Sequence, residues 1–216
     1  MKPRDRLQNA RLLLVTDPRP DLTFRVAAAV RGGVDIVQFR EKRSSREDML
    51  SLAAELKGIC EQTNALFTVN DDVELARFSG AHGVHLGQKD EPVARAREIL
   101  SPDAIVGRSV GTVEEALEAV WEGADYLGVG TVYATPTKPD AEVRGPALLR
   151  EVARIAPPIP WFAIGGVTIE TAREVADAGA PGFAVVRAVL DAKEPEAAAR
   201  ELRSFLADAS PERTPA

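Results

Sequence analysis

The sequence predicts an α/β protein of one domain, built as a closed barrel of eight parallel strands with a helix after each strand. Four times a glycine suited to ending a helix is followed at once by an apolar run, at residues 33, 80, 123 and 179. Each interval between these glycines matches about two units of a ~5-residue strand and a ~12-residue helix, so one further unit lies between each pair. The apolar runs are continuous, as in strands buried on both faces. The 216 residues, 45% of them hydrophobic, contain no linker-like tract, which favours one barrel-sized domain.

The first half of the chain contains four strand–helix units. The expected strands are 11–17, 35–39, 65–69 and 83–86, and the expected helices are 22–30, 45–63, a short helix from 73, and 93–100. In the helix at 45–63 the apolar residues recur at helical spacing. Ser45 fits its N-cap, and Asp48 three residues later gives an acidic variant of the capping box.

The second half contains four more units. The expected strands are 104–107, 125–129, 160–164 and 182–186, and the expected helices are 112–121, 147–155, 169–178 and 194–207. Thr112 with Glu115 predicts another capped helix start. A long loop at 131–145 accounts for most of the extra length in the last glycine interval. We therefore expect a (β/α)8 TIM barrel over 11–208, with a flexible segment at 1–10 and a loose tail at 209–216.

The alternative fold is a doubly wound open sheet. It would need a glycine-rich phosphate-binding turn after the first strand, and the chain has Val15-Thr16-Asp17-Pro18 there. The barrel is therefore the preferred interpretation.

Composition excludes several classes of function. The net charge of −6 argues against a nucleic-acid-binding surface over the whole protein. The single cysteine, Cys60, excludes an internal disulfide, and its apolar helical surroundings predict a buried structural thiol. We find no signal-peptide pattern and no apolar run of about 20 residues, so a cytoplasmic protein that does not enter membranes is expected. Self-association stays open.

Seven of the eight predicted strands end in a polar or glycine cluster. In a barrel of this type the active site lies at the carboxyl ends of the strands. The clusters are Gln38-Phe39-Arg40-Glu41-Lys42, Asn70-Asp71-Asp72, Gly87-Gln88-Lys89-Asp90, Arg108-Ser109, Thr135-Pro136-Thr137-Lys138, Gly165-Gly166 and Val186-Arg187. Any one of them would more often be a helix cap or a solvated charge, and His85 is expected to be a core or rim residue. The joint placement on one rim favours a functional site.

The residue types at this rim suggest phosphate chemistry. Arg40, Lys42 and Lys138 supply cations, and Asp71 and Asp90 supply carboxylates from neighbouring strands. Mg²⁺ prefers one or two carboxylates together with phosphate oxygens, and a metal-bridged diphosphate is a good leaving group. The glycine pair after the seventh strand suggests a second phosphate site. Two phosphate-bearing ligands on one rim suggest a transferase that joins them.

Taken in order, these clusters resemble the thiamine-phosphate synthase family, from Leu12 to about Ala188. The resemblance implies a Mg²⁺-dependent enzyme that joins 4-amino-2-methyl-5-hydroxymethylpyrimidine diphosphate to a thiazole phosphate, giving thiamine phosphate and pyrophosphate. It implies that the pyrimidine diphosphate is held by Gln38, Arg40, Lys42, Asn70, Ser109 and Lys138, and Mg²⁺ by Asp71 and Asp90. It implies that the thiazole phosphate is held by Thr135, Thr137, Gly166, Val186 and the backbone at Arg187. Phe39, Glu41 and Pro136 belong to the same substrate-binding motifs, and Arg40, Lys42, Ser109 and Lys138 would assist catalysis.

Two departures from the family pattern leave other functions open. Arg187 stands where the family usually has serine, and Gly107-Arg108-Ser109-Val110 is more similar to the sister branch of thiazole tautomerases. That branch has a histidine where this chain has Gly111, and it lacks the two carboxylates and the Thr-Pro-Thr-Lys loop, so the synthase is preferred. A catalytically silent regulator that binds a phosphate ligand is the third hypothesis.

Overall fold

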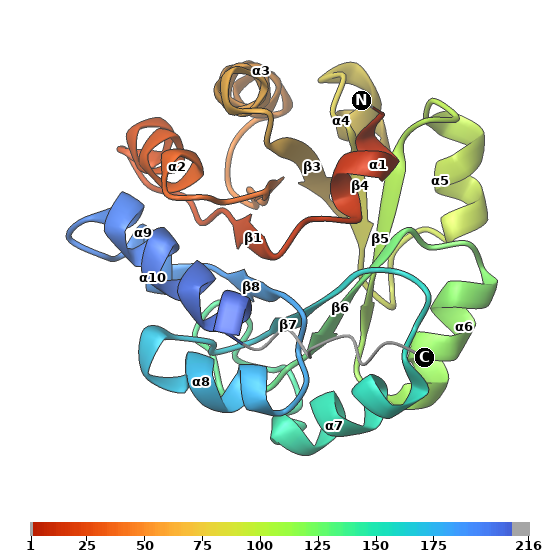
Figure 1. Ribbon diagram of the computed structural model, residues 1–216. Coiled ribbons are helices and arrows are strands. Elements are labelled where there is room, and N and C mark those ends of the chain that lie inside the picture. Colours follow the sequence, from red (N-terminus) through yellow and green to blue (C-terminus); the bar gives the residue numbers. More distant parts are fainter. Residues whose placement is uncertain (1, 209–216) are drawn as a thin grey trace.

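The protein is a closed ring of eight parallel strands surrounded by helices (Figure 1), as seen in a computed structural model that describes residues 2–208. The strands follow one another in sequence order around the ring, and the last pairs with the first. The prediction of a single (β/α)8 barrel is therefore confirmed.

The elements agree with the sequence prediction to within a few residues. The strands are β1 (Leu12–Val15), β2 (Ile36–Phe39), β3 (Leu66–Asn70), β4 (Gly83–Leu86), β5 (Ile105–Val110), β6 (Tyr126–Gly130), β7 (Trp161–Ile164) and β8 (Phe183–Val185). The helices are α1 (Pro3–Leu7), α2 (Leu22–Arg31), α3 (Arg46–Thr63), α4 (Val73–Phe78), α5 (Val93–Ile99), α6 (Val113–Trp121), α7 (Gly145–Ile155), α8 (Ile169–Asp177), α9 (Arg187–Leu190) and α10 (Pro195–Asp208). The sequence did not predict α1 or α9. It also ended β5 at residue 107, three residues early, so Ser109 lies inside a strand rather than after it.

The repeated glycines have the backbone conformation that their position predicts. Their φ angles are 103° at Gly33, 64° at Gly80, 86° at Gly123 and 96° at Gly179. A left-handed residue at this place ends the helix, and glycine adopts it without steric cost. The chain then enters β2, β4, β6 or β8.

In three of these repeats the residue two positions after the glycine accepts a hydrogen bond from a neighbouring strand. Asp35 Oδ2 accepts from the first amide of β1 at 3.0 Å, and Asp125 Oδ2 accepts from an amide of β5 at 2.7 Å. His82 Nδ1 does the same for β3 at 2.9 Å. In these three repeats the contact joins the entry of β2, β4 or β6 to the strand before it.

The core has two layers because the strands are buried on both faces. One cluster fills the inside of the barrel and includes Leu13, Ile36, Leu66, Tyr126 and Phe162. A larger cluster lies between the strands and the helices. Successive side chains along a strand point to opposite faces, so strand residues alternate between the two layers.

The amino-terminal end of the barrel is closed by α1. Leu7 and Ala10 are buried, at 1% and 3% exposure, and belong to the inner cluster. Here the structure departs from the flexible segment expected at 1–10. A single leucine in a polar stretch gives no periodic pattern in the sequence. Its role becomes visible only in the folded protein, where it covers the amino-terminal end of the barrel. The tail expected at 209–216 lies outside the described residues.

Cys60 is a free thiol with no exposed surface, as expected for a structural cysteine. Burial raises the pKa of this thiol to about 12, which keeps it protonated and unreactive at neutral pH.

Over residues 2–208, none of the helices combines the length and the apolar character needed to cross a membrane.

Candidate active site

The floor of the site is made of two side-chain pairs that face the inside of the barrel near the carboxyl ends of the strands. Gln38 Nε2 of β2 donates to Asn70 Oδ1 of β3 at 2.7 Å. His85 Nε2 of β4 lies 2.9 Å from Ser109 Oγ of β5. Three of the predicted substrate-binding side chains are therefore brought together on four adjacent strands.

His85 is fully buried and acts as a neutral hydrogen-bonding partner of Ser109. Burial, together with the nearby charge of Arg108, lowers its pKa to about 4. Glycines on the neighbouring strands leave room for the ring, since a Cβ at Gly107 would lie 2.5 Å from His85 Nδ1. The expectation that His85 is a buried core or rim residue is confirmed.

The two predicted metal-binding carboxylates face each other above this floor. Asp71 follows β3 in a left-handed conformation (φ 65°), and its amide donates to His85 O at 2.8 Å. Asp90 closes a turn after β4, in which its Oδ2 accepts from the Gly87 amide at 2.7 Å. Burial raises the pKa of Asp71 to about 6, helped by a hydrogen bond that its protonated carboxyl donates to Asp90 and by repulsion from the Asp90 charge. Two like charges so close together call for a cation between them.

Cationic side chains surround the carboxylates. Lys42 Nζ lies 3.8 Å from Asp71 Oδ2, and the lysine side chain is 59% exposed. Arg40 is held at its backbone by Thr16, whose Oγ1 accepts from the Arg40 amide at 2.8 Å. The Arg40 guanidinium reaches the loop after β6, where Nη2 lies 3.5 Å from Thr137 O. Both cations help to lower the pKa of Asp71 against the effect of its burial.

The loop at 131–145 is packed against the glycine pair that follows β7. Gly165 and Gly166 have φ angles of 99° and 66°. The Tyr133 amide donates to Gly165 O at 2.9 Å, and a Cβ at Gly165 would lie 2.4 Å from Thr131 Cγ2. Glycine is therefore required here for the close approach of the loop, in addition to any ligand that the backbone binds. The same loop carries Thr137, whose Oγ1 is buried and finds no hydrogen-bond partner in the described part of the chain.

At the end of β8, Val186 precedes the short helix α9, and Arg187 is its first residue. Arg187 Nε lies 4.0 Å from Asp191 Oδ2. Arg19 competes for that carboxylate, with Nη2 only 2.8 Å from Asp191 Oδ1. The better-paired partner of Asp191 is therefore Arg19, and Arg187 is only weakly held.

Three predicted substrate-binding side chains do not join this group. Phe39 is 1% exposed and stacks on Phe67 in the layer between strands and helices, with 6.3 Å between ring centroids. The Glu41 carboxylate accepts from the Arg43 amide at 2.6 Å, and Pro136 is exposed on its loop. These three residues lie within the site motifs in the sequence, but their side chains do not point into the site.

Two residues that shape the site were given no role by the sequence analysis, although Arg108 belongs to one of its strand-end clusters. Thr16 is fully buried and clamps the backbone of Arg40, and Arg108 is buried next to the turn that carries Asp90. The available signal for Thr16 was a threonine placed directly after an apolar strand. Arg108 required knowledge that β5 continues past residue 107.

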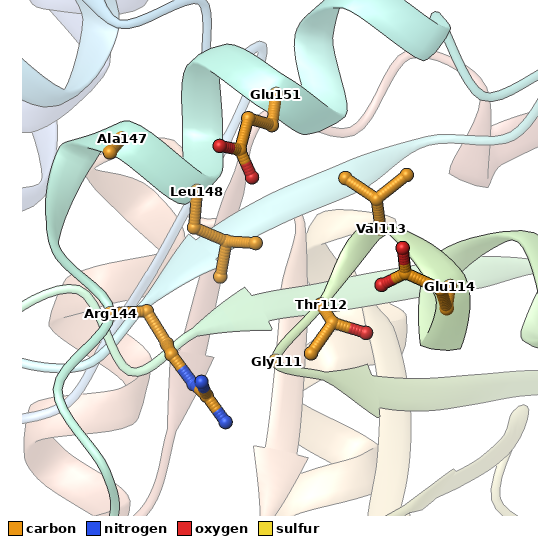
Figure 2. A pocket seen from close by; sticks show the side chains of 8 residues that line it. All are labelled: Gly111, Thr112, Val113, Glu114, Arg144, Ala147, Leu148 and Glu151. Atoms are coloured by element: carbon orange, nitrogen blue, oxygen red, sulfur yellow. The ribbon is translucent and has the colours of Figure 1, made fainter.

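A separate pocket of about 340 Å³ lies beside the rim, between the first turns of α6 and α7 (Figure 2). It is lined by Gly111, Thr112, Val113, Glu114, Arg144, Ala147, Leu148 and Glu151. None of the predicted site residues belongs to this lining, so the pocket is distinct from the carboxylate pair.

The fold and this rim define a (β/α)8-barrel protein whose polar side chains gather on the face where such barrels bind their ligands. The chain belongs to the thiamine monophosphate synthase family, whose sequence model matches residues 12–189. The resemblance drawn from the sequence motifs is therefore confirmed.

Individual relatives agree with this assignment. The thiamine-phosphate synthase of Halorhodospira halophila is 46% identical over 196 residues, which cover 90% of this chain and 93% of that protein. The thiamine-phosphate synthase of a Synechocystis strain is 45% identical over 206 residues, covering 95% of this chain. The chain spans about 60% of the length of that cyanobacterial relative. Among solved structures, the thiamine phosphate pyrophosphorylase of Pyrococcus furiosus is 38% identical, with a TM-score of 0.85 and coverage of 96% and 98% of the two chains.

Proposed function

We propose that this protein condenses 4-amino-2-methyl-5-hydroxymethylpyrimidine diphosphate with a thiazole phosphate, releasing pyrophosphate and giving thiamine phosphate. The observation that carries the proposal is the close pair of carboxylates, Asp71 and Asp90, flanked by cations at the carboxyl ends of the strands. The reaction class is that of the related thiamine-phosphate synthases. We place the reaction in the cytoplasm, in keeping with the free thiol of Cys60.

The residues fit a magnesium ion. Asp71 and Asp90 offer two carboxylates whose mutual repulsion a divalent cation would remove. Among residues 2–208 there is no group of three or more His, Cys, Asp or Glu side chains that could hold a metal. Two carboxylates are what Mg²⁺ uses when phosphate oxygens and water complete its coordination. When bound, the ion would supply positive charge to the leaving diphosphate.

The remaining charge of the diphosphate would be taken by this chain's own cations. Arg40 and Lys42 stand on the β2 side of the carboxylates, and we assign Lys138 to the opposite side, from the loop after β6. Arginine and lysine make charge-assisted hydrogen bonds to phosphate oxygens. Gln38 and Asn70 form the hydrogen-bonding floor for the pyrimidine, and the Ser109 hydroxyl adds a donor to the diphosphate.

The thiazole phosphate is assigned to the other side of the rim. The buried Thr137 hydroxyl lacks a hydrogen-bond partner among residues 2–208, which supports a hydrogen bond to a ligand oxygen. Thr135, Gly166, Val186 and the backbone at Arg187 complete the proposed phosphate site. The loose pairing of Arg187 leaves its guanidinium free to add to this site.

The reaction then needs little covalent chemistry from the protein. The bond between the pyrimidine methylene carbon and the diphosphate oxygen breaks, and both electrons leave with the diphosphate. The resulting cation is stabilised by the amino group of the pyrimidine ring, and the thiazole nitrogen donates its lone pair to form the new carbon–nitrogen bond. Arg40, Lys42, Ser109 and Lys138 would stabilise the leaving group, while the rim holds both reactants in position.

The test is to mix the purified protein with Mg²⁺ and both substrates and to follow thiamine phosphate by mass spectrometry. Product that forms with Mg²⁺ and stops when the ion is chelated would support the synthase. Absence of product, together with retained binding of thiazole phosphate, would overturn the proposal in favour of the tautomerase or the silent binding protein.

A further inference from the structure

Arg108 is a buried cation that binds backbone rather than an acidic partner. The residue is only 9% exposed. Its Nη1 donates to Gly87 O at 2.8 Å and lies 3.4 Å from Glu91 O. Among residues 2–208, the structure gives Arg108 no ion pair. Burying a guanidinium costs free energy unless its hydrogen bonds are made, so these two carbonyl contacts stabilise the buried Arg108 side chain.

The two carbonyls bracket Asp90. Gly87 is the centre of the turn: its amide donates to Asp90 Oδ2 at 2.7 Å, and its carbonyl accepts both from the Asp90 amide at 3.2 Å and from Arg108. A Cβ at Gly87 would lie 2.9 Å from Asp90 Oδ2, so a larger residue here would displace the Asp90 carboxylate. Any movement of the Gly87 carbonyl would move the Asp90 carboxylate with it.

The turn is also tied to β5 in the opposite direction. Gln88 Nε2 donates to Ser109 O at 2.6 Å, so a side chain of the turn holds the strand while a side chain of the strand holds the turn. These reciprocal contacts fix the distance between Asp90 and the Ser109 end of β5.

We infer that Arg108 is a positioning residue for the cation site, which it preorganises by clamping the turn 87–91 so that the Asp90 carboxylate stays against Asp71. The inference rests on the proposed function, because that function assigns a cation to these carboxylates. The Arg108 Nη1 atom is turned toward the turn backbone, and we assign it no direct bond to the cation. Its effect is therefore on cation affinity, and the thiazole phosphate on the far side of the rim is unaffected.

The test measures Mn²⁺ alone, by the loss of its free-ion paramagnetic resonance signal as protein is added. Arg108→Met should weaken Mn²⁺ binding by about 10- to 100-fold, the range found when partners that orient metal ligands are removed. Arg108→Lys, which keeps the charge and one donor, should lie between Arg108→Met and the unaltered protein. The matched control is Arg97→Met. Arg97 also donates to loop carbonyls, at Ala104 and Gly123, but it lies at the amino-terminal end of the barrel, where it pairs with Asp125 as well. Its loss should leave Mn²⁺ affinity unchanged.

Unchanged Mn²⁺ affinity in both Arg108 variants, in samples shown to be folded by circular dichroism, would overturn the inference. Turnover separates this result from a failure of the proposed function. Mn²⁺ binding that depends on Asp90 and Arg108 without any thiamine phosphate formed would overturn the synthase and support the clamp. In an active enzyme, excess Mg²⁺ should restore the kcat of Arg108→Met while the KM for thiazole phosphate stays the same, a split that general loss of stability would not produce.

Discussion

The two ends of the barrel use the same residue types in opposite ways. At the amino-terminal end, Asp35 Oδ2 lies 2.6 Å from Arg203 Nη1, and Asp125 Oδ2 lies 2.5 Å from Arg97 Nη2. Each of these carboxylates also accepts from strand amides. At the carboxyl end, Asp71 faces another carboxylate, and the nearest lysine is 3.8 Å away.

The difference shows which end is built for stability and which for ligands. Carboxylates at the amino-terminal end find all their partners inside the chain, so they join strands to helices. At the carboxyl end the partners are incomplete, and the pKa of Asp71 rises to about 6 because burial and Asp90 both disfavour its charge. Ionisable groups left in such surroundings mark sites where a ligand supplies the missing interaction.

The largest expected effect is at the carboxyl end. Asp71→Asn and Asp90→Asn each remove a charge from the proposed cation site while keeping the shape of the side chain. We expect kcat to fall by about 100-fold or more, the scale seen when a group that stabilises developing charge is removed. Steady-state assays of thiamine phosphate formation measure this, and thermal unfolding serves as the control. Normal activity in both variants would contradict the metal assignment.

The converse change is Asp125→Ala at the amino-terminal end. It removes the carboxylate that pairs with Arg97 and accepts from the Val106 amide, and this carboxylate is only 14% exposed. Removing one partner of such a pair should cost about 3 kcal/mol in the free energy of unfolding. Urea unfolding measures the loss. The kcat of the folded fraction should not change, and a large drop in kcat would show that the two ends are not separate in function.

The contrast between the ends also explains what the sequence could reveal. Helix-ending glycines and continuous apolar runs are local features, so the eight units could be predicted. Asp71 and Asp90 could be placed together because neighbouring parallel strands end at the same edge. That Asp35, His82 and Asp125 accept hydrogen bonds from adjacent strands was hidden, because it depends on strand register.

Side-chain direction was the other limit. Phe39 and Gln38 are adjacent in one motif, yet alternation sends Gln38 to the site and Phe39 to the outer core. The underestimated length of β5 hid the same alternation between Arg108 and Ser109. The packing of Leu7 into the amino-terminal end of the barrel was not predictable from its polar neighbours, since only the assembled barrel offers the apolar surface that it contacts.

A smaller expected effect distinguishes the two proposed substrate sites at the carboxyl end of the barrel. Lys138→Ala should raise the KM for the pyrimidine diphosphate by about tenfold, which corresponds to roughly 1.4 kcal/mol of lost interaction. The KM for thiazole phosphate should change much less, because that ligand is assigned to Thr135, Thr137 and the β7–β8 side. Lys193→Ala, at an exposed lysine after α9, is the matched control. Equal increases in both KM values would count against the assignment of Lys138.

The smallest expected effect concerns His82, which takes the place that Asp35 and Asp125 hold in the other repeats. Its Nδ1 accepts from the Phe67 amide, so protonation of that nitrogen would break the hydrogen bond. Burial lowers its pKa, and the charges of Arg6 and Lys57 lower it further, against an opposing effect of Glu61.

The sign of the pH dependence follows from this shift. Because the pKa of His82 is lower in the folded protein than its unfolded value of about 6.5, the unfolded chain binds more protons as the pH falls. The stabilisation from neutral His82 is therefore complete above about pH 6.5 and is lost progressively as the pH falls toward the folded pKa. His82→Asn keeps an acceptor that does not titrate. We expect the unaltered protein to lose more unfolding free energy than His82→Asn as the pH falls from 8 to 5. Urea unfolding of both proteins over this range measures the difference. Parallel curves would show that the histidine acceptor at this repeat does not make the amino-terminal end sensitive to acid.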